Sequence, residues 1–190
     1  MRSGGQKTVT FVLGGARSGK SRYAQELASA FRRVVFVATA RRDDAEMRAK
    51  IARHRRERPS AWKTIEITTG LDRALREQAR SADLLIVDCL TLYLANLIGR
   101  KRGEGDRIRS HIQSLCEAIQ EVEASVVIVS NEVGCGVVPA FRSGREYRDL
   151  LGEFNQQIAR VADRVILMVA GLPLTVKDRS AGRKTAGMKG

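Results

Sequence analysis

Gly14-Gly15-Ala16-Arg17-Ser18-Gly19-Lys20-Ser21 is the stretch of this sequence that decides the fold. It matches G-x-x-x-x-G-K-[ST], the phosphate-binding loop, and the sequence on either side agrees with that interpretation. The apolar run 8–13 predicts a buried strand before the loop, and residues 21–31 predict a helix after it. Glycines let the backbone close around an anion with its N–H groups pointing inward, and the helix adds the positive end of its dipole. An ordinary turn with a helix-capping serine is the alternative.

Two side chains of the loop have specific predicted roles. Lys20 is expected to reach the β- and γ-phosphates, and the Ser21 hydroxyl is expected to hold Mg²⁺. The whole loop is expected to bind nucleotide, that is Gly14, Gly15, Ala16, Arg17, Ser18, Gly19, Lys20 and Ser21. The motif therefore predicts a nucleoside triphosphate as ligand without specifying the reaction.

Short, continuous apolar runs recur along the chain, which is typical of central strands in a parallel sheet covered on both faces. The expected strands are 9–13, 34–37, 84–87, 126–129 and 165–169, with 65–67 as a further short one. Apolar residues also step by three or four over 108–122 and 147–161, which predicts two helices with core-facing stripes. Alternating strands and helices predict one α/β domain, a P-loop NTPase over residues 1–177, followed by a basic flexible tail over 178–190.

Composition and charge limit the class of protein. The 190 residues suffice for one domain with a core, and no apolar run approaches the ~20 residues that span a bilayer. Because residues 1–7 lack a signal-peptide core, a cytoplasmic protein is expected. The formal charge of +13 is concentrated in 48–58 and 177–189, and suits either nucleic acid or anionic nucleotides. Neither cluster has aromatic residues interleaved for stacking, which favours nucleotides and predicts no nucleic-acid partner.

Polar residues follow the predicted strands, at the edge where ligands of α/β sheets bind. Asp88 ends one strand, where a carboxylate holds Mg²⁺ in P-loop enzymes, although a helix cap is the alternative. Glu66 is a candidate to accept hydrogen bonds from a base or ribose, and segment 131–134 is another candidate at this edge; turn chemistry explains both equally well. Thr39, Ala40 and Arg41 follow the second strand and either line the nucleotide or form a solvated loop.

His54 lies in a strongly basic segment that reads as a helix. Cationic neighbours lower the pKa of a histidine and keep its imidazole neutral and nucleophilic. The same cations would bind phosphates arriving at the ring. A solvated basic helix is the alternative, and these residues alone do not decide between the two.

Taken together, the motifs resemble the bifunctional adenosylcobinamide kinase / adenosylcobinamide-phosphate guanylyltransferase family of cobalamin biosynthesis. The resemblance runs from about Val9 to Lys177. The motifs that carry it are loop 14–21 with Arg22, Ala38-Thr39-Ala40, Arg53-His54-Arg55 with Arg58-Pro59 and Trp62, Asn131-Glu132-Val133-Gly134, Val138-Pro139, and Gly171-Leu172-Pro173. The chain departs from the family in its basic tail, and in Asp88, where some relatives carry Glu.

The resemblance implies two reactions. ATP or GTP phosphorylates adenosylcobinamide, and GTP then transfers GMP to that phosphate through a GMP-histidine intermediate on His54. It implies catalytic residues His54 and Lys20, a RecA-like mostly parallel sheet flanked by helices, and a homotrimer. Further nucleotide contacts are implied for Arg55, Arg56, Glu57, Arg58, Glu66 and Asp88, and Mg²⁺ for Ser21 and Asp88. A generic small-molecule P-loop kinase with an inert His54, and a RecA-like nucleic-acid-binding ATPase, are the alternatives.

Overall fold

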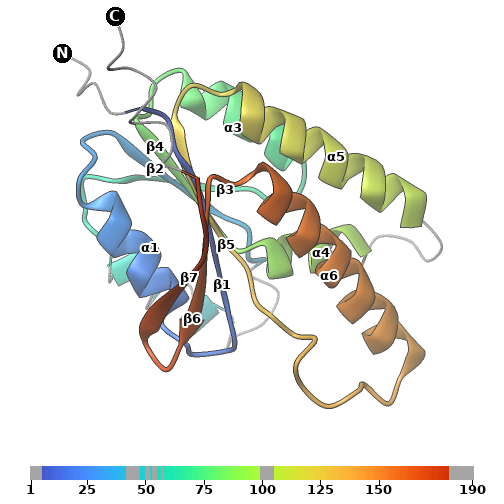
Figure 1. Cartoon of the computed structure of the whole chain (residues 1–190). Coiled ribbons are helices and arrows are strands. Elements are labelled where there is room, and N and C mark those ends of the chain that lie inside the picture. Colours follow the sequence, from blue (N-terminus) through green and yellow to red (C-terminus); the bar gives the residue numbers. More distant parts are fainter. Residues whose placement is uncertain are drawn as a thin grey trace, which may run out of the picture.

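The computed structural model describes residues 6–41, 48–49, 52, 55–56, 58–98 and 105–179. They form a seven-stranded sheet in the order β3-β2-β4-β5-β1-β6-β7 (Figure 1). Neighbouring strands are parallel except for β6 and β7, which pair antiparallel. The strands are β1 (Val9–Gly14), β2 (Val34–Ala38), β3 (Lys63–Glu66), β4 (Leu84–Asp88), β5 (Ser125–Val129), β6 (Arg164–Val169) and β7 (Leu172–Asp178).

Every strand expected from a long apolar run is confirmed to within one residue at each end. Both β2 and β5 are buried at all five positions, as a strand covered on both faces requires. The short strand expected at 65–67 is displaced to 63–66, and its residues are half-buried or exposed because β3 lies at the edge of the sheet.

Helices lie on both faces of the sheet. Helix α1 (Lys20–Ala28) lies on one face, and α3 (Leu71–Ala79), α4 (Leu90–Ile98), α5 (Gly105–Glu121) and α6 (Arg142–Val161) lie on the other (Figure 1). The smaller hydrophobic cluster joins α1 to the sheet, and the larger one joins the sheet to α3, α4, α5 and α6. The helical stripes predicted over 108–122 and 147–161 correspond to α5 and α6, and both face this larger core.

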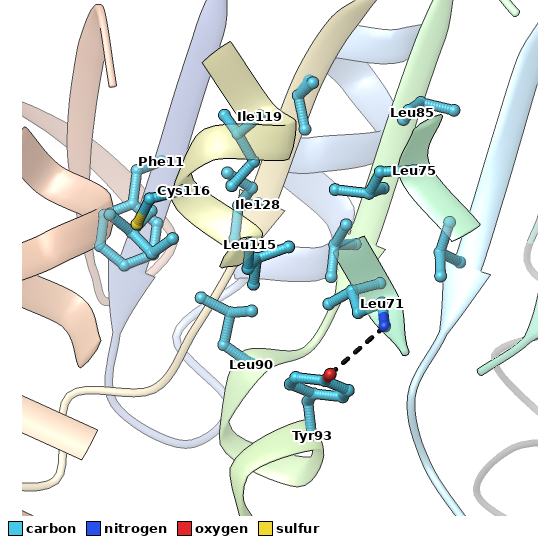
Figure 2. Close-up of a cluster of buried hydrophobic side chains, with 14 of the residues drawn as sticks. Phe11, Leu71, Leu75, Leu85, Leu90, Tyr93, Leu115, Cys116, Ile119 and Ile128 are labelled. Atoms are coloured by element: carbon cyan, nitrogen blue, oxygen red, sulfur yellow. Dashed lines mark hydrogen bonds between the residues drawn. The ribbon is translucent and has the colours of Figure 1, made fainter. Parts of the chain in front are cut away.

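A buried tyrosine links two helices in the larger core. The hydroxyl of Tyr93, on α4, accepts a hydrogen bond from the N–H of Leu71 at 3.3 Å (Figure 2). Leu71 is the first residue of α3, so this bond satisfies one of the amides that a helix start leaves unpaired. Burial raises the pKa of Tyr93, which keeps the hydroxyl neutral.

Strand β7 was not expected from the sequence. It pairs only with β6, and six of its seven residues are exposed, so it has no alternating apolar pattern to detect. Its end is fixed to the body of the protein: Lys177 Nζ donates to the carbonyl oxygen of Ala159 at 2.7 Å, at the end of α6. Asp178 forms an ion pair with Arg164 at 3.3 Å.

No helix within the described parts of the chain is long and apolar enough to cross a membrane.

Candidate active site

The phosphate-binding loop connects β1 to α1 and depends on its glycines. Gly14 has φ +151°, and a Cβ there would lie 2.5 Å from the carbonyl oxygen of Met168, on the neighbouring β6. Gly19, with φ +94°, stands immediately before α1 in the left-handed conformation. Only glycine fits both positions without strain, so the local sequence dictates this turn.

Lys20 points into the loop. Its side chain is buried, and Nζ donates to the carbonyl oxygen of Gly15 at 2.6 Å. The ammonium group is therefore held where a phosphate group of a nucleotide would meet the loop amides. Ser21 follows at the start of α1 and is half-buried, whereas Ala16 and Arg17 on the outer part of the loop are exposed.

A second turn lies against the loop. The N–H of Gly171, between β6 and β7, donates to the carbonyl oxygen of Ser18 at 3.1 Å. A Cβ on Gly19 would lie 3.4 Å from the Cα of Gly171, so the two turns approach at van der Waals distance. The sequence showed a Gly-Leu-Pro motif here but did not indicate that it supports the loop.

Asp88 lies at the same edge of the sheet. It ends β4 and is paired in register with Ala38 of β2 on one side and Val129 of β5 on the other. Its side chain is half-buried, and the peptide bond that follows it is cis. The structure thus places Asp88 and the phosphate loop on one edge, with β5 between them.

Thr39 is fully buried behind Asp88. Its hydroxyl accepts from the N–H of Cys89 at 2.8 Å and donates to the carbonyl oxygen of Cys89 at 2.7 Å. The Thr39 side chain therefore holds the backbone next to Asp88, whereas the sequence interpretation expected it either to line the nucleotide or to lie in a solvated loop. Ala40 and Arg41 follow it, half-buried and exposed respectively.

Three polar side chains behind this edge were missed from the sequence. Asn96 Nδ2 donates to the carbonyl oxygen of Thr39 at 2.8 Å, and Thr91 Oγ1 accepts from the N–H of Asn131 at 2.8 Å. Asn155 Nδ2 donates to the carbonyl oxygen of Asn131 at 3.1 Å. A signal was available for two of them, because Thr91 and Asn96 are polar residues in the otherwise apolar helix α4.

The basic segment is described only in part. His54 and Glu57 lie outside the described residues, whereas Arg55 and Arg56 are helical and exposed. Arg58 is half-buried, with its guanidinium carbon 3.4 Å from the centroid of the Phe36 ring. Phe36 belongs to the cluster beneath α1, so Arg58 itself lies against this face of the sheet through a cation–π contact.

Glu66 lies far from the phosphate loop along the sheet. It ends β3 and is exposed, and strands β2, β4 and β5 separate it from β1. At a spacing of about 4.8 Å per strand, it lies roughly 19 Å from the phosphate loop. This separation is compatible with the expected contact to a base or ribose and argues against one to the phosphates.

The residues present fit a magnesium ion held together with a nucleotide. No group of three or more His, Cys, Asp or Glu side chains gathers within the described ranges to form a metal site of its own. Mg²⁺ bound to nucleotide phosphates needs only one or two protein oxygen ligands, because phosphates and waters supply the rest. The Ser21 hydroxyl and the Asp88 carboxylate are of this kind.

The chain matches, over residues 10–176, the protein family described as "Cobinamide kinase / cobinamide phosphate guanyltransferase". The chain belongs to this family. It is 43% identical over 170 residues to the "Bifunctional adenosylcobalamin biosynthesis protein CobP" of Pseudomonas aeruginosa, covering 87% of this chain and 95% of the relative. It is 38% identical over 180 residues to the "Bifunctional adenosylcobalamin biosynthesis protein CobU" of Escherichia coli K12. That match covers 89% of this chain and 99% of the relative. The resemblance found in the motifs is confirmed.

A solved structure with little sequence similarity confirms the fold class. A prototypical ATPase from the type III secretion system of pathogenic bacteria superimposes with a TM-score of 0.57 at 11% identity. The match covers 92% of this cobinamide kinase family member and 57% of the ATPase chain. At this identity the likeness concerns the fold alone, the mostly parallel, helix-flanked sheet of RecA-like P-loop proteins.

Proposed function

We propose that this chain phosphorylates adenosylcobinamide with ATP or GTP and then transfers GMP from GTP to the resulting phosphate, releasing pyrophosphate. The supporting observation is the phosphate loop with the Lys20 ammonium held 2.6 Å from the carbonyl oxygen of Gly15, in a chain that belongs to a family of kinases and guanylyltransferases. The substrates and products follow from this membership, and the roles of individual residues below are proposals.

In the first step, the loop binds the triphosphate. The N–H groups of residues 14–21 surround the β- and γ-phosphates, and Lys20 places its charge beside the γ-phosphate. Mg²⁺, when bound by Ser21 and Asp88, would offset the phosphate charge. The acceptor hydroxyl attacks the γ-phosphorus, and the bond to the β–γ bridging oxygen breaks, leaving a nucleoside diphosphate.

In the second step, we assign His54 as the nucleophile. An imidazole nitrogen attacks the α-phosphorus of GTP, and the bond to the α–β bridging oxygen breaks to release pyrophosphate. An oxygen of adenosylcobinamide phosphate then attacks the same phosphorus and frees the histidine. Arg55 and Arg56 support this assignment because they are exposed cations beside position 54.

The remaining assignments concern contacts and assembly. The nucleotide contacts proposed beyond the loop are Thr39, Ala40, Arg41, Arg55, Arg56, Glu57, Arg58, Glu66 and Asp88, with Thr39 and Arg58 acting through the backbone and segment that they hold. We also propose a cytoplasmic homotrimer with a catalytic domain over 1–177 and a basic tail over 178–190. Val169, Leu172 and Leu174 give the trimer some support, since the β6–β7 hairpin exposes these large apolar side chains. Sedimentation analysis at several protein concentrations tests the trimer.

One labelling experiment tests the function. The protein is incubated with α-labelled GTP and Mg²⁺, denatured and counted. A label that is stable in alkali, lost in acid and absent from His54→Ala is expected. His111→Ala is the matched control, because this second histidine lies on α5, on the face of the sheet opposite α1, and the variant should keep the label.

The alternatives give different results in the same experiment. A generic small-molecule kinase would transfer the γ-phosphate but leave the protein unlabelled. A nucleic-acid-binding ATPase would also stay unlabelled and would show salt-sensitive DNA binding with DNA-stimulated hydrolysis.

A further inference from the structure

One carboxylate at the phosphate edge has no assigned role. Among the described residues, acidic side chains follow β3, β4 and β5 at this edge, namely Glu66, Asp88 and Glu132. Because β5 is hydrogen-bonded directly to β1, Glu132, which lies three residues after the end of β5, follows a strand adjacent to the one that leads into the phosphate loop. The spacing of strands puts β5 about 5 Å, β4 about 10 Å and β3 about 19 Å from β1. Of these three described residues, Glu132 is thus the one whose backbone lies closest to the phosphate loop.

The backbone of Glu132 is joined to the loop itself. Its N–H donates to the carbonyl oxygen of Gly14 at 3.0 Å, continuing the pairing in which Ser130 N–H donates to Val12 at 3.0 Å. The carboxylate is half-buried, and its Oε1 accepts from the N–H of Gly134 at 2.6 Å. No ion pair joins it to a basic residue in the described parts of the chain. A carboxylate held in this way keeps its second oxygen for another donor.

The loop that begins at Glu132 continues into an exposed apolar tip. Val137, Val138 and Phe141 are 95%, 61% and 80% exposed. The backbone under this tip is fixed, because Arg145 Nη1 donates to the carbonyl oxygens of Pro139 at 2.9 Å and Ala140 at 2.7 Å. The loop therefore offers a carboxylate beside the phosphate site and apolar surface farther out. This arrangement suits a large, partly apolar acceptor molecule that carries a hydroxyl group on a side chain.

We propose that the loop between β5 and α6 is the acceptor side of the site and that Glu132 is the general base of phosphoryl transfer. The carboxylate accepts the proton of the acceptor hydroxyl as its oxygen bonds to the γ-phosphorus. The bond from that phosphorus to the β–γ bridging oxygen breaks, and the electron pair leaves with the nucleoside diphosphate. This assignment rests on the proposed kinase step, and it leaves the guanylylation of His54 untouched because that step needs no acceptor hydroxyl.

Glu132→Gln tests the assignment, because the amide oxygen can still accept from the N–H of Gly134 while the basic carboxylate is lost. Phosphoryl transfer to adenosylcobinamide is measured under single turnover with saturating nucleotide, and labelling by α-labelled GTP is measured on the same preparation. The matched control is Glu117→Gln on α5, where Oε1 likewise accepts one hydrogen bond, from Gln113 Nε2 at 2.9 Å. Phosphoryl transfer should fall about 10²- to 10⁴-fold in Glu132→Gln alone, with unchanged GMP labelling.

The outcomes separate this inference from the function on which it rests. Phosphoryl transfer within threefold of wild type in Glu132→Gln, or equal losses of transfer and labelling, would overturn the role as base. A wild-type protein that neither transfers phosphate nor takes up label would overturn the proposed function, and this inference with it.

Discussion

The N–H of Gly171 donates a hydrogen bond to the carbonyl oxygen of Ser18 at 3.1 Å, so the turn between β6 and β7 is tied to the middle of the phosphate loop. Gly171 adopts φ +85°, a conformation that side-chain-bearing residues rarely take. The turn of the β6–β7 hairpin thus supports the phosphate loop.

Replacing Gly171 should weaken this support. We expect Gly171→Ala to lower the free energy of unfolding by about 1–3 kcal/mol because of backbone strain, and to raise the dissociation constant of GTP. Chemical denaturation and calorimetric titration measure the two effects. Gly152→Ala is the control: it lies inside α6 with open space around a Cβ, and should stabilise the protein by about 0.5–1 kcal/mol. Equal stability of the two variants would contradict the role of the turn.

Two adjacent glycines of the loop should respond differently to alanine. A Cβ on Gly14 would meet the carbonyl oxygen of Met168 at 2.5 Å, whereas a Cβ on Gly15 would meet no heavy atom within 4 Å. Gly14→Ala should therefore lower the free energy of unfolding by about 1–3 kcal/mol. Gly15→Ala should leave the free energy of unfolding within about 0.5 kcal/mol of the wild-type value. Thermal denaturation of both variants, without nucleotide, checks the difference.

The Thr39 hydroxyl should contribute to both stability and nucleotide binding. Thr39→Val keeps the shape of the side chain but leaves the N–H of Cys89 without the bond it now makes to Oγ1 at 2.8 Å. The free energy of unfolding should fall by about 1–3 kcal/mol, because a buried N–H loses its partner. Mg²⁺-dependent nucleotide binding should also weaken, because Asp88 directly precedes Cys89. Thr39→Ser keeps the hydroxyl and should retain Mg²⁺-dependent binding. If both variants bound nucleotide equally well, the proposed link to Asp88 would be wrong.

Much of the fold could be predicted because central parallel strands have a recognisable sequence pattern. Runs such as 84–87 are apolar without interruption, since both faces of these strands are covered. Strand β7 could not be predicted in this way, because its residues are exposed and only pairing with β6 makes them a strand. The order of the strands in the sheet could not be predicted either, since it depends on contacts between segments far apart in the sequence.

The site was predictable in its loop but not in what supports it. The constraints on 14–21 are local: glycines for the turn, a lysine and a serine at fixed spacing. The contact of Gly171 with Ser18 and the burial of Thr39 arise from the way strands meet at the sheet edge, and no pattern within either segment encodes them. Polar residues inside the apolar helix α4 were the available signal for the network behind that edge.

Alkaline pH should destabilise the protein through the buried thiol of Cys89. Burial raises the pKa of Cys89 from 9.0 to about 11, because the thiolate is poorly solvated there. The folded state thus holds this proton more tightly than the unfolded state. The resulting stability is fully present below pH 9 and is lost as pH rises through 11, at up to about 1.4 kcal/mol per pH unit. Cys89→Ala should show a shallower fall than wild type between pH 9 and 11 in urea denaturation. Cys135→Ala, which removes an exposed thiol, should follow the wild-type curve.

Phe141 tests whether the exposed tip of the β5–α6 loop meets the acceptor. Its side chain is 80% exposed, so Phe141→Ser should cost less than about 0.5 kcal/mol of stability while removing a large apolar contact surface. If the acceptor's apolar body rests there, the KM for adenosylcobinamide should rise at least about tenfold, with GTP binding and GMP labelling unchanged. Val176→Ser on β7 is the control, because this side chain is also exposed and belongs to neither the β5–α6 loop nor the residues used to support the trimer; it should leave that KM unaltered. A KM that stays constant in Phe141→Ser while the sedimentation mass falls would mean that the tip contacts another copy of the chain and not the acceptor.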